Sequence, residues 1–290
     1  MFALLGFILV FGSVLGGFAA MGGNLWVLWQ PWELVIIIGA ALGAFVIANP
    51  KSVLRDTFKA CRSVLRGKPY NKAEYLEMFS LLYMLFKVSK DDLRKIEKDL
   101  DSPNRSSFFK KFPLVSQNPR NVRFIADYFR LFLLGSSKSH EMEALLDTEL
   151  DSIERELNRV PNALYTVADS LPALGIVAAV LGVIKAMGSI NQPPEVLGML
   201  IGGALVGTFL GVLLSYGVVG PLANAIRARG EQELAYYIAI KTSIIAFLND
   251  YPPQICAEYG RKTISADVRP AFEEVEKATY EAAKKTGINV

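Results

Sequence analysis

The fold class is decided by residues Val196 to Ile226, VLGMLIGGALVGTFLGVLLSYGVVGPLANAI, a run of 31 residues without a charged side chain. A run of about 18 or more apolar residues is typical of a helix that crosses a membrane. Glycines recur in it at helical spacing, at Gly203, Gly207 and Gly211, and small residues at this spacing let helices pack closely in lipid. The stretch indicates an integral membrane protein with one tightly packed span within Val196 to Pro221.

Three further apolar stretches complete the predicted spans. Phe2 to Met21 has 20 residues and Leu34 to Pro50 has 17, all of them uncharged. Ser170 to Ile184 has only 15, but it is long enough as far as Ile190 if Lys185 extends its side chain to the interface. The sequence therefore predicts an all-α integral membrane protein with four transmembrane helices and a helical cytoplasmic domain.

The first apolar stretch has a competing interpretation as a secretory signal peptide, because Phe18-Ala19-Ala20 resembles a cleavage site. It lacks the basic n-region that such a peptide carries, so we expect a retained span. The linker after it contains Trp26, Trp29 and Trp32 and neither Lys nor Arg. This composition fits the aromatic belt at a membrane interface.

The overall composition agrees with a membrane protein. The 290 residues are 52% hydrophobic and 20% charged, against about 25% charged in soluble domains, and the mean hydropathy is +0.31. These values exclude a disordered protein, a disulfide scaffold and a soluble enzyme. Because Cys61 and Cys256 are isolated and His140 is the one histidine, we expect neither a metal site nor a histidine-based catalytic set. We also expect no cofactor.

Basic residues orient the spans. Of 31 Lys and Arg, 21 lie between Lys51 and Arg159 and 9 follow from Arg227 on, whereas the short connections Gly22 to Glu33 and Gly188 to Leu197 have none. The positive-inside rule then places both termini and the long middle segment in the cytoplasm. The predicted segments are a transmembrane hairpin (1–50), a cytoplasmic helical domain (51–167), a second hairpin (168–222) and a cytoplasmic helical extension (223–290).

Ionisable residues are missing from the middle of every predicted span. Glu33, Asp169 and Lys185 lie at span edges, whereas pumps and ion-coupled transporters mark their path with intramembrane charges. In the fourth span, Thr208, Ser215 and Tyr216 are the polar side chains. A self-contained pump is therefore not expected, and a titrating carboxylate would have to come from another chain.

Two prolines lie at the cytoplasmic ends of these spans. Pro172 is expected in the first turn of the third span, where its missing N–H costs nothing. Around Pro221 the apolar periodicity continues as far as Leu248, which predicts a helix that runs on into the cytoplasm. A proline inside such a helix removes a hydrogen bond and bends it, so Pro221 is a candidate hinge.

The cytoplasmic residues are helical by their periodicity. Lys87 to Asp101 is expected to form a short amphipathic helix, and its basic side is either a solvated face or a docking surface for a charged partner. A longer helix from Met142 to Leu157 leads to Pro161. Acidic and basic residues nearly balance on this side, which argues against nucleic acid as a partner.

Three stretches identify a resemblance. They are Ala168 to Ser189 (ADSLPALGIVAAVLGVIKAMGS), Val206 to Ala223 (VGTFLGVLLSYGVVGPLA) and Pro252 to Ile264 (PPQICAEYGRKTI). They resemble the third span, the fourth span with its proline, and the PP…E-[FY]-GRK-[TS] signature of the MotA family. Members of this family are the A subunits of the flagellar motor stator. The resemblance covers essentially the whole chain.

The resemblance implies a homo-oligomeric ring of A subunits in the bacterial inner membrane, in contact with lipid. The ring would surround a dimer of the single-span B subunit (MotB type), whose aspartate accepts the proton. It would push on the rotor protein FliG. By motif, Pro172 and Pro221 would be the coupling prolines and Thr208 would face the ion path. Ala179 stands where sodium-driven relatives carry a threonine, which favours protons because a sodium ion would lose an oxygen ligand.

The rotor contacts implied by the resemblance are a basic residue and a glutamate in the cytoplasmic segment. Glu97 matches the glutamate, and either Lys90 or Arg94 matches the basic residue. Two other classes remain as alternatives. An ExbB- or TolQ-like energiser of envelope transport usually has three spans, so the hairpin at Phe2 to Pro50 argues against it. A membrane hydrolase would need a nucleophile and a base that the sequence does not offer, so we do not expect an enzyme.

Overall fold

The computed structural model describes residues 2–64, 70–135 and 138–286, and all regular secondary structure in these ranges is helical. The chain divides into two compact units, one of Met1–Gly67 with Glu156–Arg229 and the other of Lys68–Arg155 with Gly230–Val290. The four segments predicted from the sequence (1–50, 51–167, 168–222 and 223–290) divide the chain into membrane and cytoplasmic parts, and not into compact units. That division stays a prediction.

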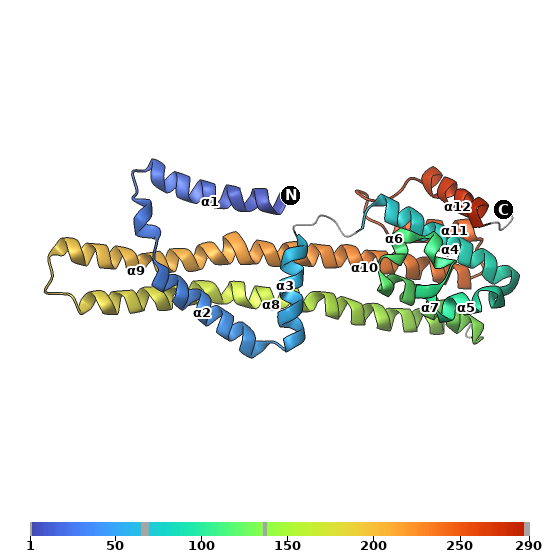
Figure 1. The fold of residues 1–290 in the computed structure, drawn as a ribbon, viewed down its shortest axis with the longest axis horizontal. Coiled ribbons are helices and arrows are strands. Elements are labelled where there is room, and N and C mark those ends of the chain that lie inside the picture. The colour runs from blue at the N-terminus through green and yellow to red at the C-terminus, as the bar shows by residue number, and fades with distance from the viewer. Residues whose placement is uncertain (1, 65–69, 136–137, 287–290) are drawn as a thin grey trace. The chain divides into compact units, whose positions relative to one another are not determined.

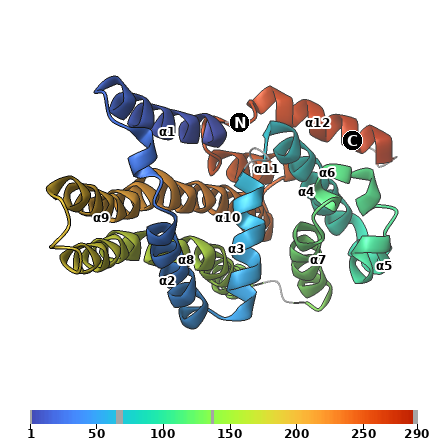
Figure 2. The same ribbon diagram turned by 60° about the vertical axis from the view of Figure 1, so that its left-hand side comes forward.

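The first unit contains the apolar helices. They are α1 (Phe2–Ala20), the 3₁₀ turn η1 (Leu25–Leu28), α2 (Pro31–Ala48), α3 (Lys51–Val64), part of α8 (Ser139–Met187), α9 (Pro194–Leu214), the π-helix η5 (Ser215–Val219) and the start of α10 (Gly220–Leu248). Figures 1 and 2 both show α8 and α9 side by side. The expected run-on helix is confirmed, since helical structure continues from Pro194 to Leu248.

Glycines bring α8 and α9 into backbone contact. A Cβ on Gly175 would lie 2.8 Å from the carbonyl oxygen of Gly207 and 3.1 Å from the Cα of Gly211. In contrast, a Cβ on Gly12, Gly16, Gly39 or Gly43 would meet nothing within 4 Å. Gly175, Gly207 and Gly211 are thus used in the contact between α8 and α9, whereas these four glycines of α1 and α2 have open space where a Cβ would lie.

Among the residues that the structure describes, three helical stretches are long and apolar enough to cross a membrane: Leu25–Ala48, Ser139–Met187 and Pro194–Leu248. They contain all or most of the second, third and fourth predicted spans. The first predicted span forms α1, whose apolar part, Leu4–Ala20, is shorter. The exposed tryptophans Trp26, Trp29 and Trp32 lie between α1 and α2 or at the start of α2.

The second unit is a helical domain built around one buried helix. Every residue of α4 (Lys72–Asp92) from Met78 to Phe86 is buried, as expected of a helix that is apolar on all sides. The elements around it are η2 (Leu93–Ile96), α5 (Glu97–Asp101), η3 (Pro103–Arg105), η4 (Phe109–Lys111), α6 (Pro113–Ser116), α7 (Pro119–Leu133), α11 (Pro253–Lys262), α12 (Phe272–Thr286) and the ends of α8 and α10.

Two expectations about local structure are wrong. Pro172 is not in the first turn of a span, because α8 is a single helix that runs through both Pro161 and Pro172. Lys87 to Asp101 is not one helix but the end of α4, the turn η2 and the short α5. The break follows from tertiary contacts, since Ile96 and Leu100 are both buried in the second unit.

Candidate functional site

The contact between α8 and α9 brings together two of the residues singled out in the sequence. Ala179 of α8 is buried, and a Cβ on Gly207 would lie 3.2 Å from its backbone nitrogen. Thr208 of α9 is half-buried, and a Cβ on Gly175 would lie 3.3 Å from its Cα. Ala179 and Thr208 therefore belong to one helix–helix seam, the α8–α9 seam, defined by Gly175, Gly182, Gly207 and Gly211.

Glu33 also reaches this seam. It lies in the first turn of α2, which begins at Pro31, where the helix dipole favours a carboxylate. A Cβ on Gly207 would lie 3.3 Å from its Oε2 and a Cβ on Gly182 3.7 Å from its Oε1. Oε2 is buried and accepts no hydrogen bond from the described residues. Sequence reasoning placed Glu33 at a span edge and did not find that its carboxylate packs against glycines of two other helices.

Pro172 leaves a gap in the hydrogen bonding of α8. A proline inside a helix has no N–H for the carbonyl four residues earlier, which here belongs to Ala168. The hydroxyl of Ser215 donates a hydrogen bond of 2.7 Å to this carbonyl oxygen. Both residues are buried. The backbone gap at Pro172 is thus filled by a side chain from the π-helix.

Pro221 lies two residues after the end of the π-helix, in the first turn of α10. The N–H of Gly220 donates to the carbonyl of Ser215, five residues earlier, and a Cβ on Gly220 would lie 3.1 Å from that oxygen. The π-helix contains Gly217, whose carbonyl Pro221 leaves without an α-helical donor. Pro221 itself is exposed and lines a cavity of about 190 Å³, which residues of α1 and α3 also line.

A polar cluster ties α8 to α10 one turn beyond Pro221. Arg227 donates a hydrogen bond of 3.0 Å to the side chain of Asn162, and its guanidinium lies 4.6 Å from the ring centre of Tyr165. The hydroxyl of Tyr165 in turn donates to the side chain of Asn224. Both hydrogen bonds of the cluster are exposed, and cation–π contacts at exposed sites contribute about 0.5–1 kcal/mol. Sequence reasoning did not find this cluster, because its members are 59 to 65 residues apart.

The three candidate rotor contacts lie in the second unit on consecutive elements. Lys90 is near the end of α4, Arg94 is in η2 and Glu97 begins α5, and all three are exposed. Burial raises the pKa of Cys256 to about 11, and the charge of Lys90 acts in the opposite direction.

Short polar contacts hold α5 in place beside these residues. The hydroxyl of Ser106 donates to Asp99 over 2.6 Å, and Arg130 pairs with Asp101 over 2.9 Å. These neighbouring carboxylates are therefore engaged within the unit, whereas Glu97 points to the surface.

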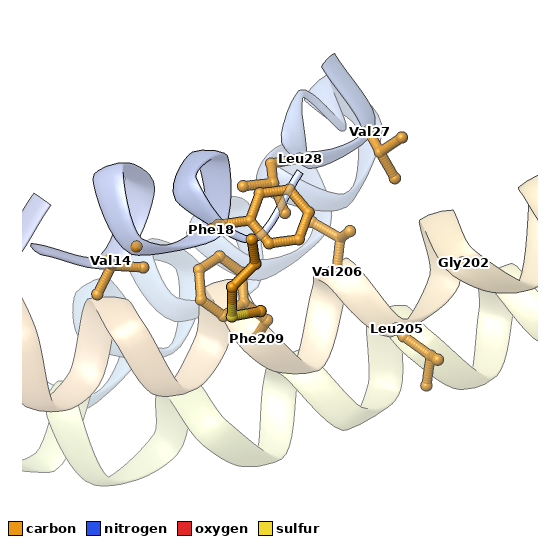
Figure 3. A pocket seen from close by; sticks show the side chains of 10 residues that line it. Val14, Phe18, Val27, Leu28, Gly202, Leu205, Val206 and Phe209 are labelled. Carbon is orange, nitrogen blue, oxygen red and sulfur yellow. The ribbon is translucent and has the colours of Figure 1, made fainter. Parts of the chain in front are cut away.

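A large pocket of the first unit has apolar walls. Its volume is about 530 Å³, and ten residues from α1, the α1–α2 linker and α9 line it, all of them apolar or glycine. Figure 3 shows Phe18 and Phe209 among them. Such a wall offers no group for acid–base chemistry. Within the ranges that the structure describes, there is also no cluster of three His, Cys, Asp or Glu that could hold a metal ion.

Two family models match separate parts of the chain. Residues 4–92 match the family described as Motility protein A N-terminal, and residues 118–238 match the MotA/TolQ/ExbB proton channel family. Motility protein A of Escherichia coli (strain K12) is 41% identical over 278 residues, covering 96% of this chain and 94% of that protein. The chain belongs to the motility protein A family. The resemblance found in the sequence is thereby confirmed.

A further relative and two solved structures match at lower identity. The chemotaxis protein LafT of Vibrio parahaemolyticus is 34% identical and covers 94% of this chain and 96% of its own. The structure of MotAB from C. jejuni matches with a TM-score of 0.75 at 18% identity, covering 92% of this chain and 97% of that one. The MotAB stator complex from Bacillus subtilis matches with a TM-score of 0.65 at 20% identity, covering 95% and 98%. These structures show that the fold is that of the family.

Proposed function

We propose that the protein is the A subunit of a bacterial flagellar stator. With a B subunit it forms a proton-conducting complex that converts proton flow into torque on the rotor. The observation that carries the proposal is the 41% identity to a motility protein A over 96% of the chain. The likeness of the fold to two MotAB structures supports it.

The arrangement of the first unit fits this role. No predicted span has an ionisable residue at its middle, so the proton-accepting aspartate comes from the single-span, MotB-type B subunit. Thr208 faces the ion path at the α8–α9 seam, and Ala179 beside it leaves no hydroxyl for a sodium ion. Protons are the coupling ion. Pro172 and Pro221 carry the resulting change to the rest of the chain.

The assembly around the chain follows from the same proposal. A homo-oligomeric ring of A subunits surrounds the B subunits in the bacterial inner membrane, with four spans per chain, both termini and a helical domain in the cytoplasm, and lipid outside. The rotor protein FliG docks at Glu97 and at Lys90 or Arg94, which are exposed. The apolar helices of the first unit support the membrane location.

An ExbB- or TolQ-like energiser of envelope transport is the alternative, because residues 118–238 match a family that includes both types. The match of residues 4–92 to the Motility protein A N-terminal family separates the two. That segment contains α1 and α2, the hairpin that three-span energisers lack. It favours the stator.

The test is rotation in a flagellated bacterium that lacks its own stator. We expect swimming and tethered-cell rotation when this chain is expressed with the B subunit of its own genome, and none with either chain alone. Rotation should stop when the proton gradient is collapsed and persist when sodium is removed. Flagella that stay paralysed although both chains are inserted in the membrane would refute the proposal.

A further inference from the structure

Ser215 makes two hydrogen bonds near the two prolines, one through its side chain and one through its backbone. Its side chain donates to the carbonyl oxygen of Ala168, the group that Pro172 leaves without a helical N–H. Its backbone carbonyl accepts the N–H of Gly220, the residue before Pro221. Ser215 thus contacts the carbonyl that Pro172 leaves unpaired, 47 positions away in the chain, and it also begins the π-helix that ends two residues before Pro221.

The side-chain contact is one that the fold needs. Ser215 is 2% exposed and Ala168 4% exposed, so water does not reach the carbonyl. A buried carbonyl without a donor costs about as much as a lost hydrogen bond. An alanine or glycine at position 215 would have nothing to donate.

The backbone contact places Ser215 at the start of the π-helix. Single-turn π-helices inside long helices are frequent at functional sites and accommodate local irregularity in a helix. Here the π-helix ends where Pro221 follows. A shift of α8 at Pro172 therefore acts on the first residue of the π-helix through a 2.7 Å hydrogen bond.

We propose that Ser215 is a positioning residue that joins the two proline sites, so that α8 at Pro172 and the π-helix before Pro221 move together. The structural link stands on the contacts above, and its use in generating torque rests on the proposed function. Ser170 shows the contrast. Its hydroxyl donates over 2.8 Å to Val167 in its own helix, an oxygen that also has the N–H of Leu171 available.

Hydrogen exchange of the full chain with its B subunit, reconstituted in lipid, tests the link. Ser215→Ala should raise the exchange of the amides from Tyr216 to Gly220 about tenfold, because a buried acceptor loses its donor. Ser215→Thr keeps the hydroxyl and should exchange as the wild type does. Ser170→Ala is the matched control and should leave these amides unchanged.

A double-mutant cycle with Pro172→Ala makes the test specific. The new alanine supplies an N–H for the carbonyl of Ala168, so Ser215→Ala should change exchange much less in that background. Equal effects in both backgrounds, or wild-type exchange in Ser215→Ala itself, would overturn the proposal. The first result would mean that Ser215 is a local packing contact unconnected to Pro172.

The effect on function is measured in the flagellated bacterium that lacks its own stator. Ser215→Ala should lower the torque per motor at unchanged membrane abundance, with recovery in Ser215→Thr and no loss in Ser170→Ala. Normal torque together with faster exchange would overturn the positioning role. If the wild-type pair does not rotate the motor, the proposed function fails, whereas the exchange cycle still decides whether the two proline sites are joined.

Discussion

Gly211 of α9 meets Leu171 of α8 backbone to backbone, since a Cβ on Gly211 would lie only 2.6 Å from the carbonyl oxygen of Leu171. The same Cβ would lie 2.9 Å from the Cα of Gly175. Backbone atoms on the opposite side cannot rotate away as a side chain could. Close approach of small residues is a main source of stability between helices in lipid, so this contact fixes the α8–α9 seam.

Gly211→Ala should therefore destabilise the first unit. The added methyl group forces the helices apart, and overpacking of this kind costs about 1–3 kcal/mol. Thermal unfolding of the purified protein in detergent measures the loss. Gly43→Ala is the control, because its Cβ would meet nothing within 4 Å of the same chain. An equal loss of thermal stability in both variants would contradict the role of the α8–α9 seam. If Gly43→Ala loses stability only in the assembled complex, Gly43 lies at a contact between subunits.

The sequence predicted the seam in part. The spacing of Gly203, Gly207 and Gly211 indicates a face that packs closely, and the structure packs that face against α8 and α2. The spacing of small residues in α1 and α2 is just as regular, yet a Cβ on any of their glycines would meet nothing within 4 Å in the chain. Periodicity defines a face of a helix and not its partner, so the sequence could not distinguish the two cases.

The remaining errors have a common physical cause. Local rules place Pro172 in a first turn, because they do not include a donor such as Ser215 from 47 residues away. They extend an amphipathic helix across Lys87 to Asp101, although Arg130 and Ser106 hold its end in other positions. In both cases a tertiary contact overrides the local preference. Glu33 does lie at the start of α2, but local rules could not show that its carboxylate lies against Gly207.

The GRK sequence of the signature motif has a structural role that predicts a pH dependence. Arg261 donates two hydrogen bonds of 2.6 Å to Glu258 and one of 3.0 Å to the carbonyl of Pro270. The hydrogen bonds from Arg261 hold the pKa of Glu258 below its usual value of 4.5. A carboxylate with a depressed pKa stabilises the fold above its unfolded pKa, and this contribution is lost as the pH falls through the folded value.

We therefore expect Glu258→Gln to lower stability at pH 7 by about 1.5–3 kcal/mol, the range for hydrogen bonds to charged groups. Below pH 4.5 the gap between wild type and variant should narrow, because the wild type then loses the same charge. Thermal melts of both proteins from pH 7 to pH 3 measure this gap. A gap that stays constant over that range would show that the charge of Glu258 is not what Arg261 stabilises.

The chain without a partner should not conduct protons, because none of the predicted spans has a titratable group at its middle. Proton flux into vesicles that hold only this chain should stay at background, and adding the B subunit should raise it. Vesicles with the B subunit alone are the control. Strong flux through the chain alone would contradict the proposed division of labour between the subunits.

Reversing the exposed charges of the second unit should weaken torque without affecting insertion. In the proposed contact with the rotor, Lys90→Glu, Arg94→Glu and Glu97→Lys would each replace an attraction by a repulsion, whereas neutralising a single exposed pair changes only about 0–1 kcal/mol. Torque at high load should fall in double reversals that include Glu97→Lys. Lys277→Glu, an exposed lysine on α12, is the control and should rotate normally. Wild-type torque in every reversal would mean that these charges form a solvated face.

Replacing Pro221 should separate folding from coupling. In Pro221→Ala the new N–H can donate to the carbonyl of Gly217, so the π-helix can relax into a continuous α-helix and the hinge is lost. Alanine is about 3 kcal/mol more favourable than proline inside a helix, so insertion should be at least as good as in the wild type while motility fails. Pro161→Ala, at a proline inside α8 that no π-helix precedes, is the matched control and should keep motility. The measurement is swimming together with the abundance of the protein in the membrane. Normal swimming of Pro221→Ala at normal abundance would show that Pro221 is not the hinge.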